Sequence, residues 1–210
     1  MTLIPDTAAL DPRVRRSRSA LMKATVALVA ERGTAAVPVS DIAEAADVSR
    51  PVVYQHFGNL DTLLLESAVD LATRELLPRM AEAGAGRNRR AGALALTRHF
   101  AEHRAFYRAV LTSSCAFALN KALTGLLIPI NRQLVHEMSG GSLDAQGEED
   151  LATFLTGGGA AFINTWVVEA ADPLDPDHFA DRLMRLSFAS PLLSSTPTTA
   201  TTTPPEGPKP

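Results

Sequence analysis

The stretch SDIAEAADVSRPVVYQHF, residues 40–57, contains two short helical patterns separated by a tight turn. Ser40 is expected to cap a first helix over 41–46 and Ser49 a second over 50–57, because a side-chain oxygen can accept the free N–H groups of a first helical turn. Small and apolar side chains allow the two helices to pack closely, and the outer face of the second stays free. This pattern predicts a helix-turn-helix that enters a DNA major groove.

The outer face of the second helix carries groups suited to DNA. A guanidinium pairs with guanine and a side-chain amide with adenine, so Arg50 and Gln55 are candidates for reading bases. A valine side chain can contact a thymine methyl group. The predicted base-reading residues are Arg50, Pro51, Val52 and Gln55. The predicted phosphate contacts in this region, which fix register without reading sequence, are Ser40, Ser49, Tyr54 and His56.

Charge is distributed unevenly along the chain. The net charge is −3, yet between Arg13 and Leu60 seven basic side chains outnumber four acidic ones. Positive charge therefore gathers where phosphate binding needs it. We expect the cluster of Arg13, Arg15, Arg16 and Arg18 to act as an arm on phosphates or in the minor groove.

Hydrophobic periodicity outside this stretch is helical throughout, with no strict alternation typical of strands, so the fold is predicted to be all-α. The expected further helices span about 14–32, 60–79, 91–103, 104–112, 115–138, 148–171 and 176–190. We predict about nine helices in an N-terminal three-helix domain and a larger helical C-terminal domain. The predicted boundaries are a flexible arm at 1–12, the helix-turn-helix domain at 13–60, the C-terminal domain at 61–190 and a disordered tail at 191–210.

Several classes of protein are disfavoured. No window approaches 18 uninterrupted apolar residues, and the N-terminus lacks a basic start, so neither a membrane span nor a secretory signal is expected. A lone cysteine, Cys115, excludes an internal disulfide and a cysteine-rich zinc site. The sequence pattern suggests no cluster of metal ligands, no phosphate loop and no nucleophile turn. We expect a cytoplasmic, non-enzymatic protein without a cofactor or metal.

Residues 26–65, VALVAERGTAAVPVSDIAEAADVSRPVVYQHFGNLDTLLL, resemble the N-terminal DNA-binding domain of the TetR family of bacterial regulators. The matching elements are ERG at the end of the first helix, D-I-A-E-x-A before the turn, V-S after it, and Y-x-H-F followed by paired leucines. The resemblance implies a homodimer on a palindromic DNA operator, with a C-terminal domain for dimerisation and ligand binding. Two positions depart from the family pattern: Asp47 stands where glycine is usual, and Leu60 where lysine is common.

The segment 151–189 resembles the last two helices of such regulators, which usually form a four-helix dimer interface. The dimer candidates are Gly157, Gly158, Leu183 and Leu186. The effector-pocket candidates, chosen as aromatic and polar groups of the middle helices, are Phe100, His103, Tyr107, Phe117, Asn120, Phe162 and Trp166.

These observations favour a repressor that a small apolar or aromatic effector releases from its operator. The alternative left open is a DNA-binding regulator without a small-molecule ligand, controlled by a protein partner or acting as an activator.

Overall fold

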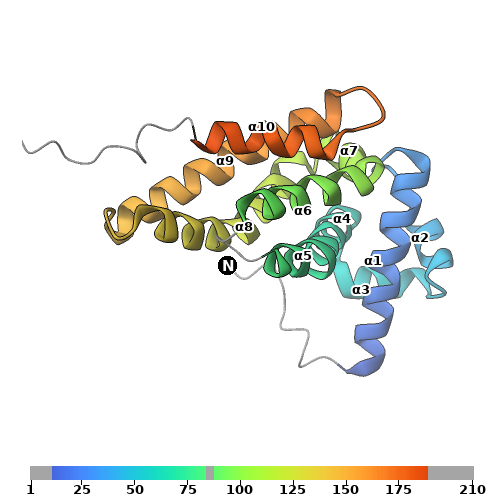
Figure 1. Cartoon of the computed structure of the whole chain (residues 1–210). Coiled ribbons are helices and arrows are strands. Elements are labelled where there is room, and N and C mark those ends of the chain that lie inside the picture. The colour runs from blue at the N-terminus through green and yellow to red at the C-terminus, as the bar shows by residue number, and fades with distance from the viewer. Residues whose placement is uncertain (1–10, 84–87, 189–210) are drawn as a thin grey trace, which may run out of the picture.

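The computed structural model describes residues 11–83 and 88–188, and within these ranges every regular element is a helix. The helix-turn-helix end and the turn between the two longest helices lie at opposite ends of the molecule (Figure 1). The elements are α1 (Pro12–Arg32), α2 (Val39–Ala45), α3 (Arg50–Phe57), α4 (Leu60–Leu71), η2 (Ala72–Leu76), α5 (Leu77–Glu82), α6 (Arg89–Glu102), α7 (Arg104–Leu111), α8 (Ala116–Ser139), α9 (Ala145–Glu169) and α10 (Pro176–Phe188). Since α4, η2 and α5 run on without a break, the described residues form nine separate helices, and the all-α prediction is confirmed.

Helix α1 begins earlier than the sequence pattern suggested. Asp11 caps it, since the backbone N–H of Arg13 donates to Asp11 Oδ1 at 2.7 Å, and Pro12 occupies the first turn, where its missing N–H costs nothing. Residues 11 and 12 therefore belong to the start of α1 and not to an arm. The rest of the predicted arm and the predicted tail at 191–210 lie outside the described residues.

Helix α2 also starts early, so the predicted capping role of Ser40 is wrong. Pro38 holds the N-cap position with φ −59°, and its carbonyl accepts the N–H groups of Asp41 and Ile42. Ser40 lies inside the first turn, and its hydroxyl donates to Asp41 Oδ1 at 3.0 Å. Ser49 does hold the N-cap position of α3, but its side chain makes no capping hydrogen bond.

The turn between α2 and α3 places Asp47 in the left-handed region, with φ +52°. Its N–H donates to the carbonyl of Glu44 and that of Val48 to the carbonyl of Ala43, both at 3.0 Å. The expectation that this position suits glycine is therefore confirmed by backbone geometry. Aspartate tolerates this conformation because its short polar side chain can bond locally, although glycine adopts it with less strain.

A buried arginine joins three helices of the N-terminal domain. Arg18 of α1 is 7% exposed, donates to the carbonyl of His56 at 2.6 Å, and forms an ion pair with Glu66 of α4. Its guanidinium lies 4.4 Å from the ring centroid of Phe57. Burial raises the pKa of Glu66, while the positive charge of Arg18 acts against that rise. Arg18 is thus an internal tie between α1, α3 and α4.

The prediction that Arg18 contacts DNA phosphate is consequently wrong. The physical reason is its helical register: Arg18 precedes Leu21, Thr25 and Val29 on the same inner stripe of α1, and all three are fully buried.

The C-terminal domain is built on a long helical pair, α8 and α9, with α10 packed against α6 and α7 against α1. Helices α9 and α10 run along one side of the molecule (Figure 1). The connecting helix α4–η2–α5 changes register through a π-turn, in which the N–H of Leu77 bonds to the carbonyl of Ala72. Pro78 follows directly and has no N–H of its own, so the wider turn lets the helix continue past the proline. One continuous helix therefore connects the DNA-binding end to the C-terminal domain.

Replacing Arg18 by alanine is expected to cost about 3 kcal/mol of unfolding free energy, because it leaves the partly buried Glu66 carboxylate without its partner. Urea denaturation measures this. Arg15→Ala, an exposed change on the same helix, should stay within about 0.5 kcal/mol of the parent chain. The double variant Arg18→Met/Glu66→Met should recover most of the loss, and a double variant as unstable as Arg18→Ala would contradict the ion-pair explanation.

Replacing Asp47 by glycine is expected to stabilise the fold by about 1 kcal/mol, because glycine adopts positive φ without strain. Asp47→Asn serves as the matched control, since it removes the charge but keeps a residue that tolerates this conformation. Equal gains from both changes in thermal unfolding would show that charge, and not backbone strain, is the cause.

Candidate DNA-binding surface and ligand cavity

The outer face of α3 presents a compact set of polar side chains. Arg50, Pro51, Tyr54 and Gln55 are exposed, while Val52 is half-buried. Arg50 Nη2 donates to Tyr54 Oη at 3.2 Å, and the guanidinium lies 5.7 Å from the tyrosine ring centroid. The two residues are one helical turn apart, so they face the same way. Tyr54 therefore holds the Arg50 guanidinium beside the helix with its remaining donors available.

The opposite face of α3 explains why this surface stays in place. Val53 and Phe57 are buried, as are Ile42 and Ala43 of α2. Val48, in the turn, packs against the same core. The two helices are thus held together through apolar contacts, and the polar face of α3 points away from them.

Three of the four arginines predicted to bind phosphate, Arg13, Arg15 and Arg16, are exposed along the first two turns of α1. They extend the positive surface beside α3. Ser40 and Ser49 are exposed as well. These five side chains stay predictions for phosphate contact.

His56 is placed differently from its prediction as a free phosphate ligand. Its ring lies half-buried between α1 and α3, with Nε2 2.9 Å from Ser17 Oγ. Burial and then the nearby charge of Arg18 lower the pKa of His56, so the ring is neutral near pH 7. A neutral imidazole tied to Ser17 offers a phosphate no charge, and its observed role is to join the two helices.

Leu60, the second departure from the family pattern, packs partly buried against the core. The helix it begins is capped by Asn59, whose Oδ1 accepts the N–H of Thr62 at 2.8 Å. The position thus contributes packing and supplies no phosphate-binding charge.

A cavity of about 190 Å³ lies among α5, α6, α8 and α9. Its walls are mainly apolar and include Phe100, Leu123 and Ile163. The polar lining includes Arg89, Asn88 and Thr124. It also includes two bonded pairs: Asn131 Nδ2 donates to Thr156 Oγ1 at 2.7 Å, and Asn164 Nδ2 to Asn120 Oδ1 at 3.2 Å. An apolar chamber with a few bonded polar groups is the usual form of a small-molecule site.

Of the seven predicted effector residues, Phe100 and Asn120 line this cavity. Phe162 and Trp166 instead stack on Phe179 of α10, with ring centroids 4.9 and 4.2 Å away. Phe117 is 82% exposed and faces solvent. These three predictions are wrong for the cavity, because aromatic residues at helical spacing also serve helix–helix packing and exposed faces.

Tyr107 and His103, also predicted as effector residues, do not line the cavity. Tyr107 is fully buried against His99, with Oη 2.8 Å from His99 Nε2. His103 Nε2 lies 2.8 Å from Glu75 Oε2. The sequence pattern suggested no cluster of metal-ligating groups, yet the fold brings Glu75, His99 and His103 together. The available signal was the four-residue spacing of the two histidines on one helix.

An apolar strip runs along α9 and α10. Gly157 and Gly158 are exposed on α9, and Leu186 of α10 is 56% exposed. Leu183 is half-buried beside them in the same shallow depression. The sequence reasoning missed Phe154, which is 71% exposed one turn before Gly158 on α9. Its four-residue spacing from Gly158 was the signal that places it on this strip.

Helix α9 is long and apolar enough to cross a membrane by length and composition. Core helices of soluble proteins pass the same test, so this is weak evidence by itself. In the fold α9 packs along α8, with Ala152, Ile163 and Val167 buried.

Known proteins resemble this chain in sequence at the helix-turn-helix and in fold over most of its length. Residues 21–67 match the family model of bacterial regulatory proteins, tetR family. No significant match is found among curated proteins.

Solved structures share the fold over most of the chain. A TetR-like transcriptional regulator from Rhodococcus sp. RHA1 is 20% identical and covers 89% of this chain and 100% of its own, with a TM-score of 0.58. The fatty acid degradation regulator FadR from Bacillus halodurans is 18% identical, covering 82% and 98%, with a TM-score of 0.60. RolR in complex with resorcinol is 22% identical, covering 83% and 88%, with a TM-score of 0.57.

The matched segment contains the helix-turn-helix described above, and the helices that follow have the fold of these regulators. Residues 21–67 are therefore similar to the tetR family of bacterial regulatory proteins, and the chain shares the fold of solved TetR-like regulators over most of its length.

Proposed function

We propose that the chain is a ligand-responsive repressor that binds a palindromic operator as a homodimer and leaves it when a small effector enters the C-terminal domain. The observation that carries the proposal is the exposed polar face of α3, where Arg50 and Gln55 stand clear of a buried apolar face. The chain acts by binding and not by catalysis.

On DNA, α3 lies in the major groove. Arg50 donates two hydrogen bonds to a guanine, and Gln55 pairs with an adenine. Val52 and Pro51 make apolar contacts with base edges. Phosphates are held by Tyr54, Ser40, Ser49 and the exposed arginines of α1. Because Tyr54 already orients the Arg50 guanidinium at 3.2 Å, little side-chain entropy is lost when the pair meets DNA.

A dimer forms through the strip on α9 and α10. Exposed Phe154 and Leu186 gain from leaving water. Gly157 and Gly158 have no atoms of the rest of the chain within 4 Å of an added Cβ, so their bare surface admits a second helix at short range. Two such chains related by a two-fold axis present two α3 helices to successive major grooves, about 34 Å apart.

The cavity sets the size of the effector. Its volume of about 190 Å³ is somewhat larger than the engineered 150 Å³ cavity that binds benzene. A single ring fits within this volume. The paired asparagines favour a ring that bears hydroxyl or carbonyl groups. The fold shared with RolR, solved with resorcinol, supports the same class of molecule.

The connecting helix provides the link between the two sites. Met80 of α5 lines the cavity, and α5 continues through η2 into α4. Helix α4 in turn packs against α1 and α3. A ligand that displaces Met80 favours a different position of this helix and hence a different spacing of the two α3 helices.

Replacing Arg50 by alanine is expected to weaken binding to the selected operator by about 1–3 kcal/mol and to relax specificity at one base pair, because the bidentate contact is lost. Fluorescence anisotropy with operator and random duplexes measures both effects. Arg132→Ala, an exposed arginine of α8, is the matched control. An equal loss on both duplexes would remove Arg50 from base reading.

Filling the cavity is expected to abolish the ligand response while leaving DNA binding intact. Resorcinol should raise the melting temperature of the parent chain and weaken its binding to operator. Ala160→Leu, which narrows the cavity, should remove both effects of resorcinol, and Ala145→Leu at the exposed start of α9 should not.

If neither resorcinol nor any single-ring phenol changes operator affinity, the effector part of the proposal fails. Control by a protein partner is then the better account. Whether bound protein lowers or raises transcription from a reporter promoter distinguishes a repressor from an activator.

A further inference from the structure

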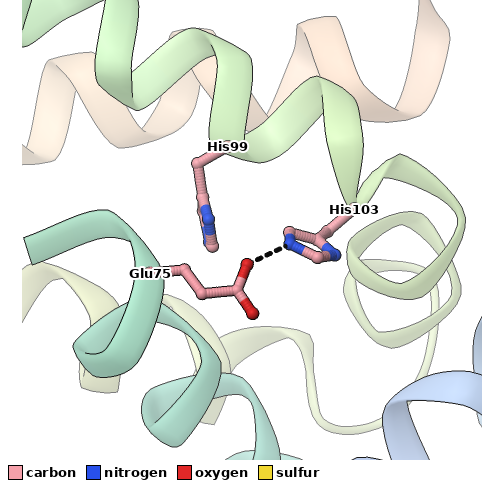
Figure 2. Close-up of side chains that lie close together, drawn as sticks. All are labelled: Glu75, His99 and His103. Carbon is pink, nitrogen blue, oxygen red and sulfur yellow. Dashed lines mark hydrogen bonds and ion pairs between the residues drawn. The ribbon is translucent and has the colours of Figure 1, made fainter. Parts of the chain in front are cut away.

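Three side chains converge beside the connecting helix, outside both the DNA-binding surface and the cavity. Glu75 comes from η2, and His99 and His103 come from the last turn of α6 and its C-cap (Figure 2). One ligand atom of each lies within 4.8 Å of the others. His103 Nε2 and Glu75 Oε2 are 2.8 Å apart, and the two histidine rings are 5.0 Å apart.

His99 contains a polar atom that the fold leaves without a partner. The residue is fully buried, its Nε2 is bonded to Tyr107 Oη at 2.8 Å, and its Nδ1 has no hydrogen-bond partner. An unpaired polar atom in the interior costs free energy that most proteins avoid. Burial, with a smaller effect of His103, lowers the pKa of His99 to about 3. The ring is therefore neutral under ordinary conditions, which is the form that coordinates metals.

We propose that Glu75, His99 and His103 form a binding site for one divalent transition-metal ion, with Zn²⁺ as the best fit. Two imidazoles and one carboxylate are a frequent ligand set for zinc, with water in the fourth position. Because Nε2 of His99 is engaged by Tyr107, Nδ1 is the nitrogen that coordinates. The ion gives this orphaned atom a partner.

The second sphere is already in place. With the metal on Nδ1, the Nε2–H of His99 donates to Tyr107 Oη, the kind of hydrogen bond that fixes the ring orientation of metal-bound histidines. Tyr107 is itself fully buried among Phe100 and Phe106, with ring centroids 4.6 and 5.3 Å away. Because Tyr107 is fixed by this packing, its hydroxyl holds the His99 ring in one orientation.

The remaining two ligands have the freedom and the access that binding requires. Ligand atoms around tetrahedral zinc lie about 3.3 Å apart, given bonds of about 2.0–2.1 Å, so the cluster must contract from its present spread. The Glu75 and His103 side chains are 29% and 24% exposed. They can rotate toward His99, and solvent can deliver the ion. Glu75 lies in the π-turn, so the metal ties η2 to α6.

The test uses the full-length chain, stripped with a chelator and titrated with zinc sulfate. We expect one ion per chain and a rise in melting temperature, and Co²⁺ in place of Zn²⁺ should give the intense visible absorption of a tetrahedral site. Glu75→Gln and His103→Gln, both at partly exposed positions, should each lose at least tenfold in affinity. His136→Gln, on α8 and 68% exposed, is the matched control and should bind normally.

Tyr107→Phe separates a metal site from a set of structural hydrogen bonds. It removes only the hydroxyl and should weaken zinc binding about 10–100-fold, with circular dichroism confirming that the helices persist. Zinc binding that survives both Glu75→Gln and His103→Gln, or that is lost in His136→Gln, would overturn the assignment. So would a parent chain that takes up no ion at micromolar zinc.

Discussion

The buried tie formed by Arg18 is the interaction on which the DNA-binding end depends. It connects the second turn of α1 to the last turn of α3 through the carbonyl of His56, and to α4 through Glu66. Removing one member would leave an uncompensated charge in the interior, so the three helices keep one arrangement. The exposed face of α3 is the consequence. Arg50 and Gln55 stand outward because Val53 and Phe57 are held inward against the helices that Arg18 joins.

The second constraint is mechanical continuity. Helix α4 passes through η2 into α5 without an interruption, so a displacement at either end is transmitted along one element. The cavity touches this element at Met80, and the Glu75–His99–His103 cluster touches it at the π-turn. Both proposed sites for small ligands thus include a residue of the helix that supports the DNA-binding surface. Coupling between the ligand sites and the DNA-binding surface would require this helix to have two alternative positions, each favoured by a different ligand.

Features that depend on neighbouring residues could be predicted from the sequence, whereas features that depend on contacts between distant segments could not. The helix-turn-helix is encoded by local signals, namely Pro51 in a first turn, Ser49 before it, and a helical spacing of apolar residues. Pairing between residues far apart in the sequence has no local signal. The sequence shows Arg18 as one more positive charge, whereas the fold buries it against Glu66 of α4. An aromatic residue at helical spacing can line a cavity or pack in the core: Phe100 lines the cavity, whereas Trp166 stacks on Phe179. The convergence of Glu75 with His99 depends on how η2 packs against α6, which no short segment specifies.

We propose that two α3 helices of a symmetric dimer read one palindromic operator. Selection of binding sites from random duplexes, followed by sedimentation of the complex, tests it most directly. We expect an inverted repeat whose half-sites are centred about 10 base pairs apart, bound by chains that associate through α9 and α10. A selected motif without inverted symmetry, or a complex with one chain per duplex, would contradict it.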